Sequence, residues 1–111
     1  VITGNTGSGV SVDLREKTTW DATLLRNTIS NNGLRGFDLQ AVDTENAFDI
    51  QIGSVATNGQ GQLTEGNIFN ANVGAAIALT LDDSSGNTGN ATGRFRIIGN
   101  TITGSLNDSR T

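Results

Sequence analysis

Short stretches along the chain alternate between large apolar residues and polar or small ones. Residues 10–14, 37–39 and 77–81 each place a large apolar side chain at every second position. Because successive side chains of a β-strand point to opposite faces, this period of two predicts strands with one apolar face. Residues 25–29 and 98–102 alternate in the same way around a central asparagine. No stretch of the sequence keeps a helical period, so we expect no helix longer than a turn.

The alternating stretches belong to an internal repeat. A shift of 27 residues superposes residues 2–12 on residues 29–39, and a shift of 40 superposes residues 27–39 on residues 67–79. A further shift of 33 adds a shorter copy, so that the copies begin near residues 2, 29, 69 and 102. The shared template is N-x-[I/F]-x-x-N-x-x-x-[G/A]-[V/F/I]-x-[V/L]. Two short strands joined by an Asn/Gly corner predict one coil of a parallel β-solenoid.

A lone coil cannot bury its inward face, whereas coils stacked about 4.8 Å apart align equivalent residues in ladders. We therefore expect an all-β parallel β-helix of about three coils with long loops, formed by residues 1–111 as one segment. Ladders of asparagine can also hydrogen-bond through their amides from coil to coil. The expected apolar ladders are Ile2, Ile29, Phe69 and Ile102, and Val10, Phe37 and Ile77. The expected asparagine ladders are Asn5, Asn32 and Asn72, and Asn27, Asn67 and Asn100.

An antiparallel sandwich is the competing interpretation, because it also uses many short strands. The dipeptides Asn32-Gly33 and Asn58-Gly59 are typical of β-hairpins and keep this alternative open. A sandwich, however, does not require equivalent residues at equivalent places in each copy. The repeat therefore favours the solenoid.

Three segments carry a resemblance to a known group of proteins. They are NTISNNGLRGFDL (residues 27–39), NIFNANVGAAIAL (residues 67–79) and GNTITG (residues 99–104). Together they resemble the repeat of the right-handed parallel β-helix in the pectate-lyase-like superfamily. The resemblance implies a right-handed solenoid. The superfamily includes polysaccharide lyases, glycoside hydrolases, phage tailspikes and bacterial surface adhesins.

The coil spacings exceed the length of a minimal coil in that superfamily, so the surplus residues are expected to leave the solenoid as loops. Trp20 is expected in the first loop, either as a lid over apolar surface or as an exposed platform for a sugar ring. Residues 48–52 alternate and predict an additional strand. The expected loops are residues 15–22, 41–45, 53–62 and 82–93.

The composition narrows the chemistry. The 111 residues include no Cys and no His, which excludes disulfides, thiolate metal sites and His-dependent catalysis. The 7 basic and 11 acidic residues give a net charge of −4, which argues against nucleic acid as the main partner. No apolar run approaches the roughly 18 residues that a membrane span needs.

Asp82 and Asp83 are the candidate pair for catalysis or metal binding. Glycosidases of the resembled superfamily use several Asp residues on neighbouring coils, and this pair matches one part of their motif. Arg94-Phe95-Arg96 matches another part only weakly. A hydrolase needs two carboxyl groups at a controlled separation, whereas adjacent residues before a glycine-rich loop favour a solvated turn. We therefore expect no catalytic residue, and no cofactor apart from a loosely held Ca²⁺ at Asp82 or Asp83.

A lyase of the resembled superfamily would hold Ca²⁺ through acidic side chains and would use an Arg or Lys as its base. The available oxygen ligands are Asp43, Glu45, Asp49, Asp82 and Asp83, and the available bases are Arg35, Arg94 and Arg96. Two glycosylation sequons are also present, which makes Asn90 and Asn107 candidate attachment sites.

The chain starts and finishes at the same phase of the repeat, and neither end shows an amphipathic cap helix. Open solenoid ends expose apolar core and unpaired strand edges. We therefore expect head-to-tail stacking of the chain on copies of itself, or membership of a longer β-helix. The expected function is that of a non-enzymatic structural or adhesive module outside the cell or at its surface. The rivals are a polysaccharide-binding or polysaccharide-cleaving β-helix, and a fibre segment that trimerises laterally.

Overall fold

The computed structural model describes residues 1–16, 18–42, 47–82 and 92–104 of the chain. These residues form ten β-strands and no helix. The described part of the chain therefore has no helix that could cross a membrane. The strands are β1 (Ile2–Thr3), β2 (Val10–Arg15), β3 (Thr19–Leu24), β4 (Thr28–Ser30), β5 (Phe37–Val42), β6 (Ala47–Ile52), β7 (Ile68–Asn70), β8 (Ile77–Asp82), β9 (Thr92–Ile97) and β10 (Thr101–Thr103).

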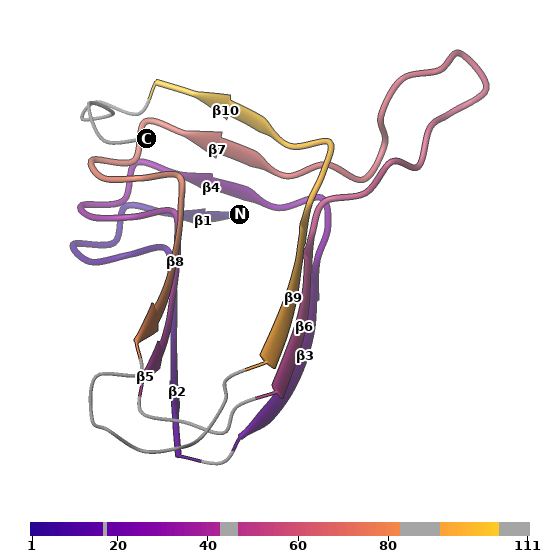
Figure 1. The fold of residues 1–111 in the computed structure, drawn as a ribbon. Helices are drawn as coiled ribbons and strands as arrows, with labels where there is room; N and C mark the ends of the chain where they lie inside the picture. Colours follow the sequence, from indigo (N-terminus) through magenta and orange to yellow (C-terminus); the bar gives the residue numbers. More distant parts are fainter. Residues whose placement is uncertain (17, 43–46, 83–91, 105–111) are drawn as a thin grey trace.

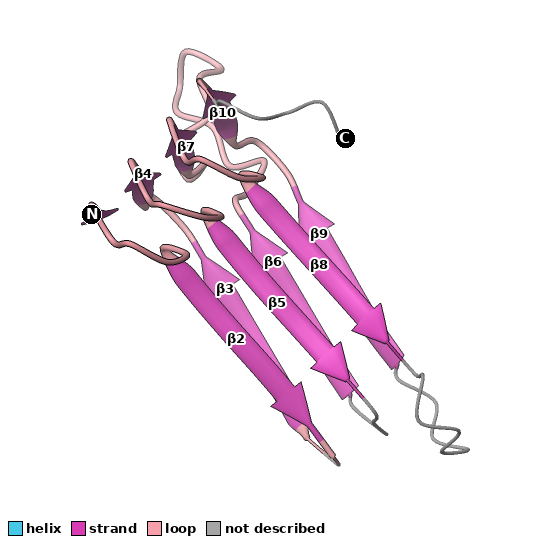
Figure 2. Ribbon diagram, turned by 90° about the vertical axis from the view of Figure 1, so that its left-hand side faces the viewer, coloured by secondary structure: helices cyan, strands magenta, loops and turns pink. Residues whose placement is uncertain are grey.

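The strands form three sheets, and all strands within a sheet pair in parallel. Sheet A has the order β1-β4-β7-β10, sheet B the order β2-β5-β8, and sheet C the order β3-β6-β9. The chain thus visits sheets A, B and C in turn, and we call each circuit a pass. Figure 1 shows the sheets around a common interior, and Figure 2 shows strands of successive passes side by side. The arrangement is compatible with a β-solenoid, and the alternative of an antiparallel sandwich is wrong.

The pairing within sheets A and B has the spacing of the sequence repeat. In sheet A, Ile29 pairs with Ile2 on one side and with Phe69 on the other. The offsets between paired passes are 27, 40 and 33 residues. The paired positions are Ile2, Ile29, Phe69 and Ile102 in sheet A, and Val10, Phe37 and Ile77 in sheet B.

The core lies between the three sheets and is centred on the second pass, which comprises β4, β5 and β6. Along β6, buried residues alternate with half-buried ones, as expected for a strand with one face inward. The side chains of Phe37, Leu39, Ile50 and Ile52 are 0% exposed. They are closed off completely because another pass lies on either side of them. The other buried apolar residues are Leu14, Ile29, Ala41, Phe48 and Phe69.

Sheet C corrects part of the sequence interpretation. The loop expected over residues 15–22 is wrong in its second half, because β3 begins at Thr19. Trp20 therefore lies in a strand, half-buried, and packs against the core. The loop expected over residues 82–93 is also too long, because β9 begins at Thr92.

The repeat comparison overlooks sheet C because its strands share no motif. β3, β6 and β9 read TWDATL, AFDIQI and TGRFRI, and no position is identical in all three. Only the alternation of inward and outward residues unites them. In the first and third passes, part of the length that the sequence interpretation assigns to loops is therefore strand, whereas the additional strand expected over residues 48–52 is confirmed as part of β6. The loop expected over residues 41–45 is shortened in the same way, since β5 extends to Val42.

One loop projects from the stack between β6 and β7 (Figure 1), and we call residues 53–66 the projecting loop. It includes the loop expected over residues 53–62. An antiparallel bridge joins Thr57 to Leu63 across it. Arg26 forms a 3.0 Å ion pair with Glu65 near its base. The loop thus stands outside the ladders and leaves the pairing of β6, β7 and their neighbours undisturbed.

The corner between sheets A and B is built alike in every pass. The residue that follows each sheet A strand has a positive φ, which turns the chain sharply and costs least for Gly or Asn. These residues are Gly4 (73°), Asn31 (53°), Ala71 (51°) and Gly104 (63°). Beside them, the backbone and side-chain nitrogens of Asn5 donate to Oδ1 of Asn32 at 3.2 and 3.0 Å. Asn32 donates to Oδ1 of Asn72 in the same way, at 3.2 and 2.9 Å.

A second asparagine ladder lies at the corner between sheets C and A. The backbone and side-chain nitrogens of Asn27 donate to Oδ1 of Asn67 at 2.9 and 3.1 Å. Those of Asn67 donate to Oδ1 of Asn100, both at 2.9 Å. Asn67 is fully buried, and a buried amide must be hydrogen-bonded to be tolerated. The two ladders therefore hold the passes in one register.

Candidate functional site

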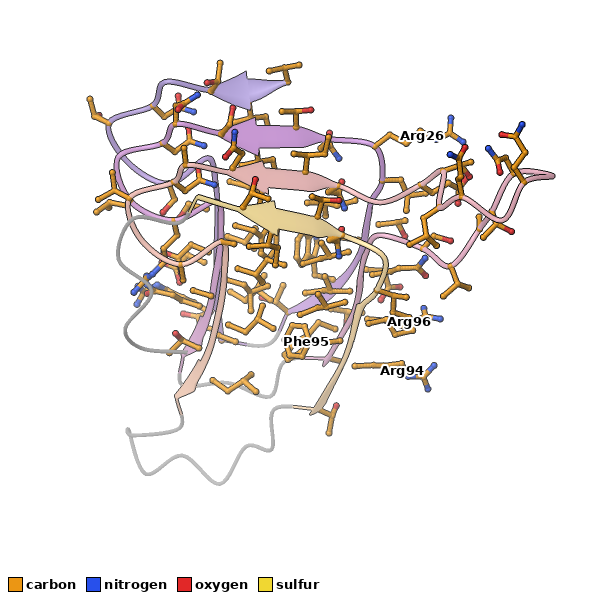
Figure 3. The ribbon with its side chains drawn as sticks, turned by 90° about the horizontal axis from the view of Figure 1, so that it is seen from above. Arg26, Arg94, Phe95 and Arg96 are labelled. Carbon is orange, nitrogen blue, oxygen red and sulfur yellow. The ribbon has the colours of Figure 1, made fainter. Side chains whose placement is uncertain are left out.

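The outer face of sheet C gathers charged side chains from all three passes. Asp21 of β3 pairs with Asp49 of β6, which pairs with Arg94 of β9. Figure 3 shows Arg94 and Arg96 projecting outward from β9, while Phe95 between them points toward the interior. We call Asp21, Asp49, Arg94 and Arg96 the charged face. It exists because alternate residues of a strand share a side of the sheet.

Asp49 is the centre of the charged face. Its Oδ1 lies 3.2 Å from Nη2 of Arg96, and its Oδ2 lies 3.8 Å from Nη1 of Arg94. The side chains of Arg94 and Arg96 are 70% and 46% exposed, respectively, so water screens both ion pairs and each adds little stability. Asp21 is exposed, and its carboxylate has no ion-pair or hydrogen-bond partner within the described ranges. The charged face thus has one unpaired carboxylate, that of Asp21, beside two arginines that both pair with Asp49.

Two shallow hollows adjoin this cluster. One is lined by Thr19, Asp21, Ala47, Phe48, Asp49, Thr92, Gly93 and Arg94. The other is lined by Asp21, Ala22, Thr23, Asp49 and Arg96. Both are open to solvent, and both share Asp21 and Asp49. Arginines can bind carboxylates of a ligand lying along such a surface, and the aspartates can accept hydrogen bonds from its hydroxyl groups.

A metal site would have few protein ligands here. Among the residues that the structure describes, no group of three or more His, Cys, Asp or Glu side chains could hold a metal ion. Asp21 and Asp49 are adjacent and could each supply a carboxylate oxygen, whereas Ca²⁺ takes six to eight oxygen ligands. Water or ligand oxygens would have to complete the coordination of an ion at this position.

The remaining residues named from the sequence do not join this face. Arg35 donates to Asp38 in β5 at 2.8 Å, so it belongs to the side of sheet B. Oδ1 of Asp38 is buried without a hydrogen-bond partner. Asp82 is the last residue of β8, and its side chain lies outside the described part of the structure. The candidates that lie wholly outside the described residues are Asp43, Glu45, Asp83, Asn90 and Asn107.

Asp21 is the member of the charged face that sequence reasoning missed. It falls within residues 15–22, which the sequence predicts as a loop, so the sequence assigns it no neighbours in a sheet. The alternation of polar and apolar residues over Thr19–Leu24 is the signal that could have placed it on a strand.

Comparison of the chain with protein-family models, with curated proteins and with solved structures found no match.

Proposed function

We propose that the chain is a non-enzymatic structural or adhesive module, folded as a right-handed parallel β-helix whose coils are the passes described above. The fold is supported by the parallel, in-register pairing of equivalent residues in three sheets. The handedness follows from the resemblance to the pectate-lyase-like superfamily. So does an extracellular or cell-surface setting, because tailspikes and adhesins belong to that group. The module acts by joining end to end with further coils.

Within the described residues no strand pairs with the outer edges of β8 and β9, and this open edge of the third pass carries the proposal. Leu81 and Ile97 are 55% and 44% exposed, although their partners in the second pass, Ala41 and Ile52, are 1% and 0% exposed. Apolar side chains along an unpaired strand edge favour the addition of another layer of strands. The first pass of a second copy can supply that layer. Such a head-to-tail contact repeats without closing and gives a filament.

The test is electron microscopy and sedimentation of the purified chain over a concentration series. We expect filaments with an axial repeat of three coils, about 14–15 Å from the strand spacing. Leu81→Lys places a charge on the open edge and should abolish assembly. The matched control is Val55→Lys on the projecting loop, where Val55 is 67% exposed, and it should assemble normally. Particles of monomer size at every concentration would contradict end-to-end joining.

A second candidate function is the binding of an acidic polysaccharide on the charged face. The observation that favours it is the alignment of Asp21, Asp49, Arg94 and Arg96 from three passes on one lateral surface. The arginines would pair with uronate carboxylates, and the aspartates would accept hydrogen bonds from hydroxyl groups or share a Ca²⁺ with the ligand. A lyase or hydrolase activity on the same ligand is the enzymatic form of this alternative.

Calorimetric titration with an oligogalacturonate, with and without Ca²⁺, tests the alternative. Binding should be lost in an Arg94→Gln, Arg96→Gln double variant. It should persist in Arg26→Gln, which removes an arginine that is paired near the projecting loop. A chain that gives no heat of binding with or without Ca²⁺ is not a receptor for this class of ligand. Release of unsaturated or reducing ends from the bound oligomer would add catalysis to binding.

A further inference from the structure

Sheet A has one more strand than sheets B and C. In the described part of the chain it contains four strands, whereas sheets B and C contain three each. If a second copy continues the stack, its β2 lies on β8 and its β3 lies on β9. The same displacement brings its β1 onto β7, which is the place that β10 already occupies. β10 of one copy and β1 of the next therefore compete for one position.

The two competing strands present the same residues. β1 and the glycine after it read Ile2-Thr3-Gly4, and β10 ends in Ile102-Thr103, followed by Gly104. Both glycines have a positive φ, 73° and 63°, so the chain turns in the same way after each strand. Starting from the end-to-end association proposed above, we infer that β10 of one copy replaces β1 of the next at each junction. The junction coil is then composite, with its sheet A strand from the first copy and its other two strands from the second.

β10 makes contacts at the junction that β1 does not make. In the described residues, the backbone N–H of Asn100 has no acceptor and Oδ1 of Asn27 has no donor. Each asparagine of this ladder donates to the one a pass later, so Asn100 of the first copy faces Asn27 of the second after the exchange. Ile102, which is 52% exposed, is covered at the same time by Ile29 of the second copy. The exchange thus continues the asparagine ladder from Asn100 into the second copy. It also buries Ile102, the last residue of the apolar ladder in sheet A.

Sheets B and C also gain complementary neighbours. Asp21, Asp49 and Arg94 share one row of sheet C, so the next residue in that row is Asp21 of the second copy. The unpaired carboxylate at one edge therefore lies beside an arginine at the other. In sheet B, Leu14 of the second copy covers the exposed Leu81. Opposite charges at the two edges favour a head-to-tail contact over contacts between like edges.

Engineered disulfides can report the exchanged junction, because the chain has no cysteine. After the exchange, Thr103 of one copy lies beside Ser30 of the next, in place of Thr3. Within one chain Ser30 and Thr103 flank Asn70 on opposite sides, roughly 9–10 Å apart by strand spacing, which is too far for a disulfide. An oxidised equimolar mixture of Ser30→Cys and Thr103→Cys chains should therefore yield a covalent dimer. Neither variant alone should yield it.

A matched pair of variants reports the opposite exchange. If β1 stays in place and β10 is expelled, Thr3 of the second copy lies beside Asn70 of the first. A mixture of Thr3→Cys and Asn70→Cys chains would then be cross-linked instead. That outcome would overturn the inference and leave end-to-end association standing. A chain that shows no association in sedimentation would defeat the inference and end-to-end joining together.

Deletions give an independent readout by sedimentation. Removing residues 1–3 deletes the strand that has to be displaced, so the concentration at half-assembly should fall about tenfold, equivalent to about 1.4 kcal/mol. Removing residues 101–111 as well leaves the junction without a sheet A strand. This double deletion should assemble more weakly than the full chain. Circular dichroism of each variant checks its fold, and unchanged assembly of the folded first variant would overturn the inference.

Discussion

The second and third passes have equivalent ladder positions, and they differ in what covers them. In sheet B, Leu39 of the second pass is fully buried and its partner Leu79 is only half-buried. In sheet C, Ile50 is fully buried and its partner Phe95 is half-buried. The residues are comparably apolar, so their burial depends on having a pass on both sides. Stability in this fold therefore resides mainly in contacts between neighbouring passes.

Truncation of a large side chain in the second pass should have the largest effect. Phe37 is 0% exposed and has Val10 on one side and Ile77 on the other. We expect Phe37→Ala to lower the free energy of unfolding by about 3–5 kcal/mol, because the neighbouring passes cannot close the cavity. Leu81→Ala at the open edge should cost about 1 kcal/mol or less. Urea unfolding of the monomer measures both, and equal losses would contradict the contrast between passes.

Interruption of the asparagine ladder should show the same contrast on a smaller scale. Asn32 accepts from Asn5 and donates to Asn72, so Asn32→Ala removes the acceptor of both Asn5 nitrogens and one of the two donors to the buried Oδ1 of Asn72. A loss of about 2–3 kcal/mol is expected from these groups. Asn5 is exposed and bonds on one side only, and Asn5→Ala should cost about 1 kcal/mol. Urea unfolding compares the two variants. A larger loss for Asn5→Ala would contradict the prediction that the middle residue of the ladder contributes more stability than the end residue.

Gly93 marks a place where the third pass leaves room for the second. A Cβ at this position would overlap the ring of Phe48, which packs on Phe95 with ring centroids 4.9 Å apart. Gly93→Ala should therefore cost about 1–3 kcal/mol through overpacking. Gly59→Ala on the projecting loop has open space around it and should change the stability by about 0.5 kcal/mol at most. Thermal unfolding at matched concentrations compares the two variants. A Gly93→Ala chain as stable as the parent would contradict the prediction, because the ring of Phe48 would then move aside without loss of stability.

The smallest effect should be a gain in stability at the corner after β7. Ala71 has φ of 51°, where the second pass has Asn31, and the left-handed region costs an alanine roughly 1–2 kcal/mol. Ala71→Gly removes this strain and adds unfolded-state entropy, for a net gain of about 0.5 kcal/mol. Ala75→Gly, whose backbone φ is not positive, should instead lose about 0.5 kcal/mol. Chemical unfolding would contradict the prediction if both variants shifted in the same direction.

Sheets A and B were accessible from the sequence because physical constraints repeat there. A buried amide such as Asn32 must find the same partners in each pass, and an inward residue such as Ile29 must fill the same space. These hydrogen-bonding and packing requirements recur at the same positions of each pass, so the same residue types recur there and form a sequence motif. Sheet C was accessible only over residues 48–52, because its outward positions vary from Asp49 to Arg94 and one inward position holds Gly93. Only the alternation remains there, and it is weaker evidence than a motif.

The charged face was hidden for a related reason. Asp49, Arg94 and Arg96 could each be named as candidates, but only the register of sheet C brings them together. Arg35 belonged to the same set of candidates and instead pairs with Asp38. Spatial neighbours in sheet C are separated by tens of residues, so their grouping follows from pairing and not from proximity in the chain.

The asparagine ladders have a further consequence, since every amide in them points the same way. In both ladders the nitrogens belong to the earlier pass and the accepting oxygen to the later one. The amide dipoles therefore add along the stack, and each bond polarises the next. The filament proposed above would therefore be polar, with acceptor oxygens exposed at one end and donor nitrogens at the other. Subunits adding to the two ends would meet different chemistry, so such a filament should elongate at unequal rates from its two ends.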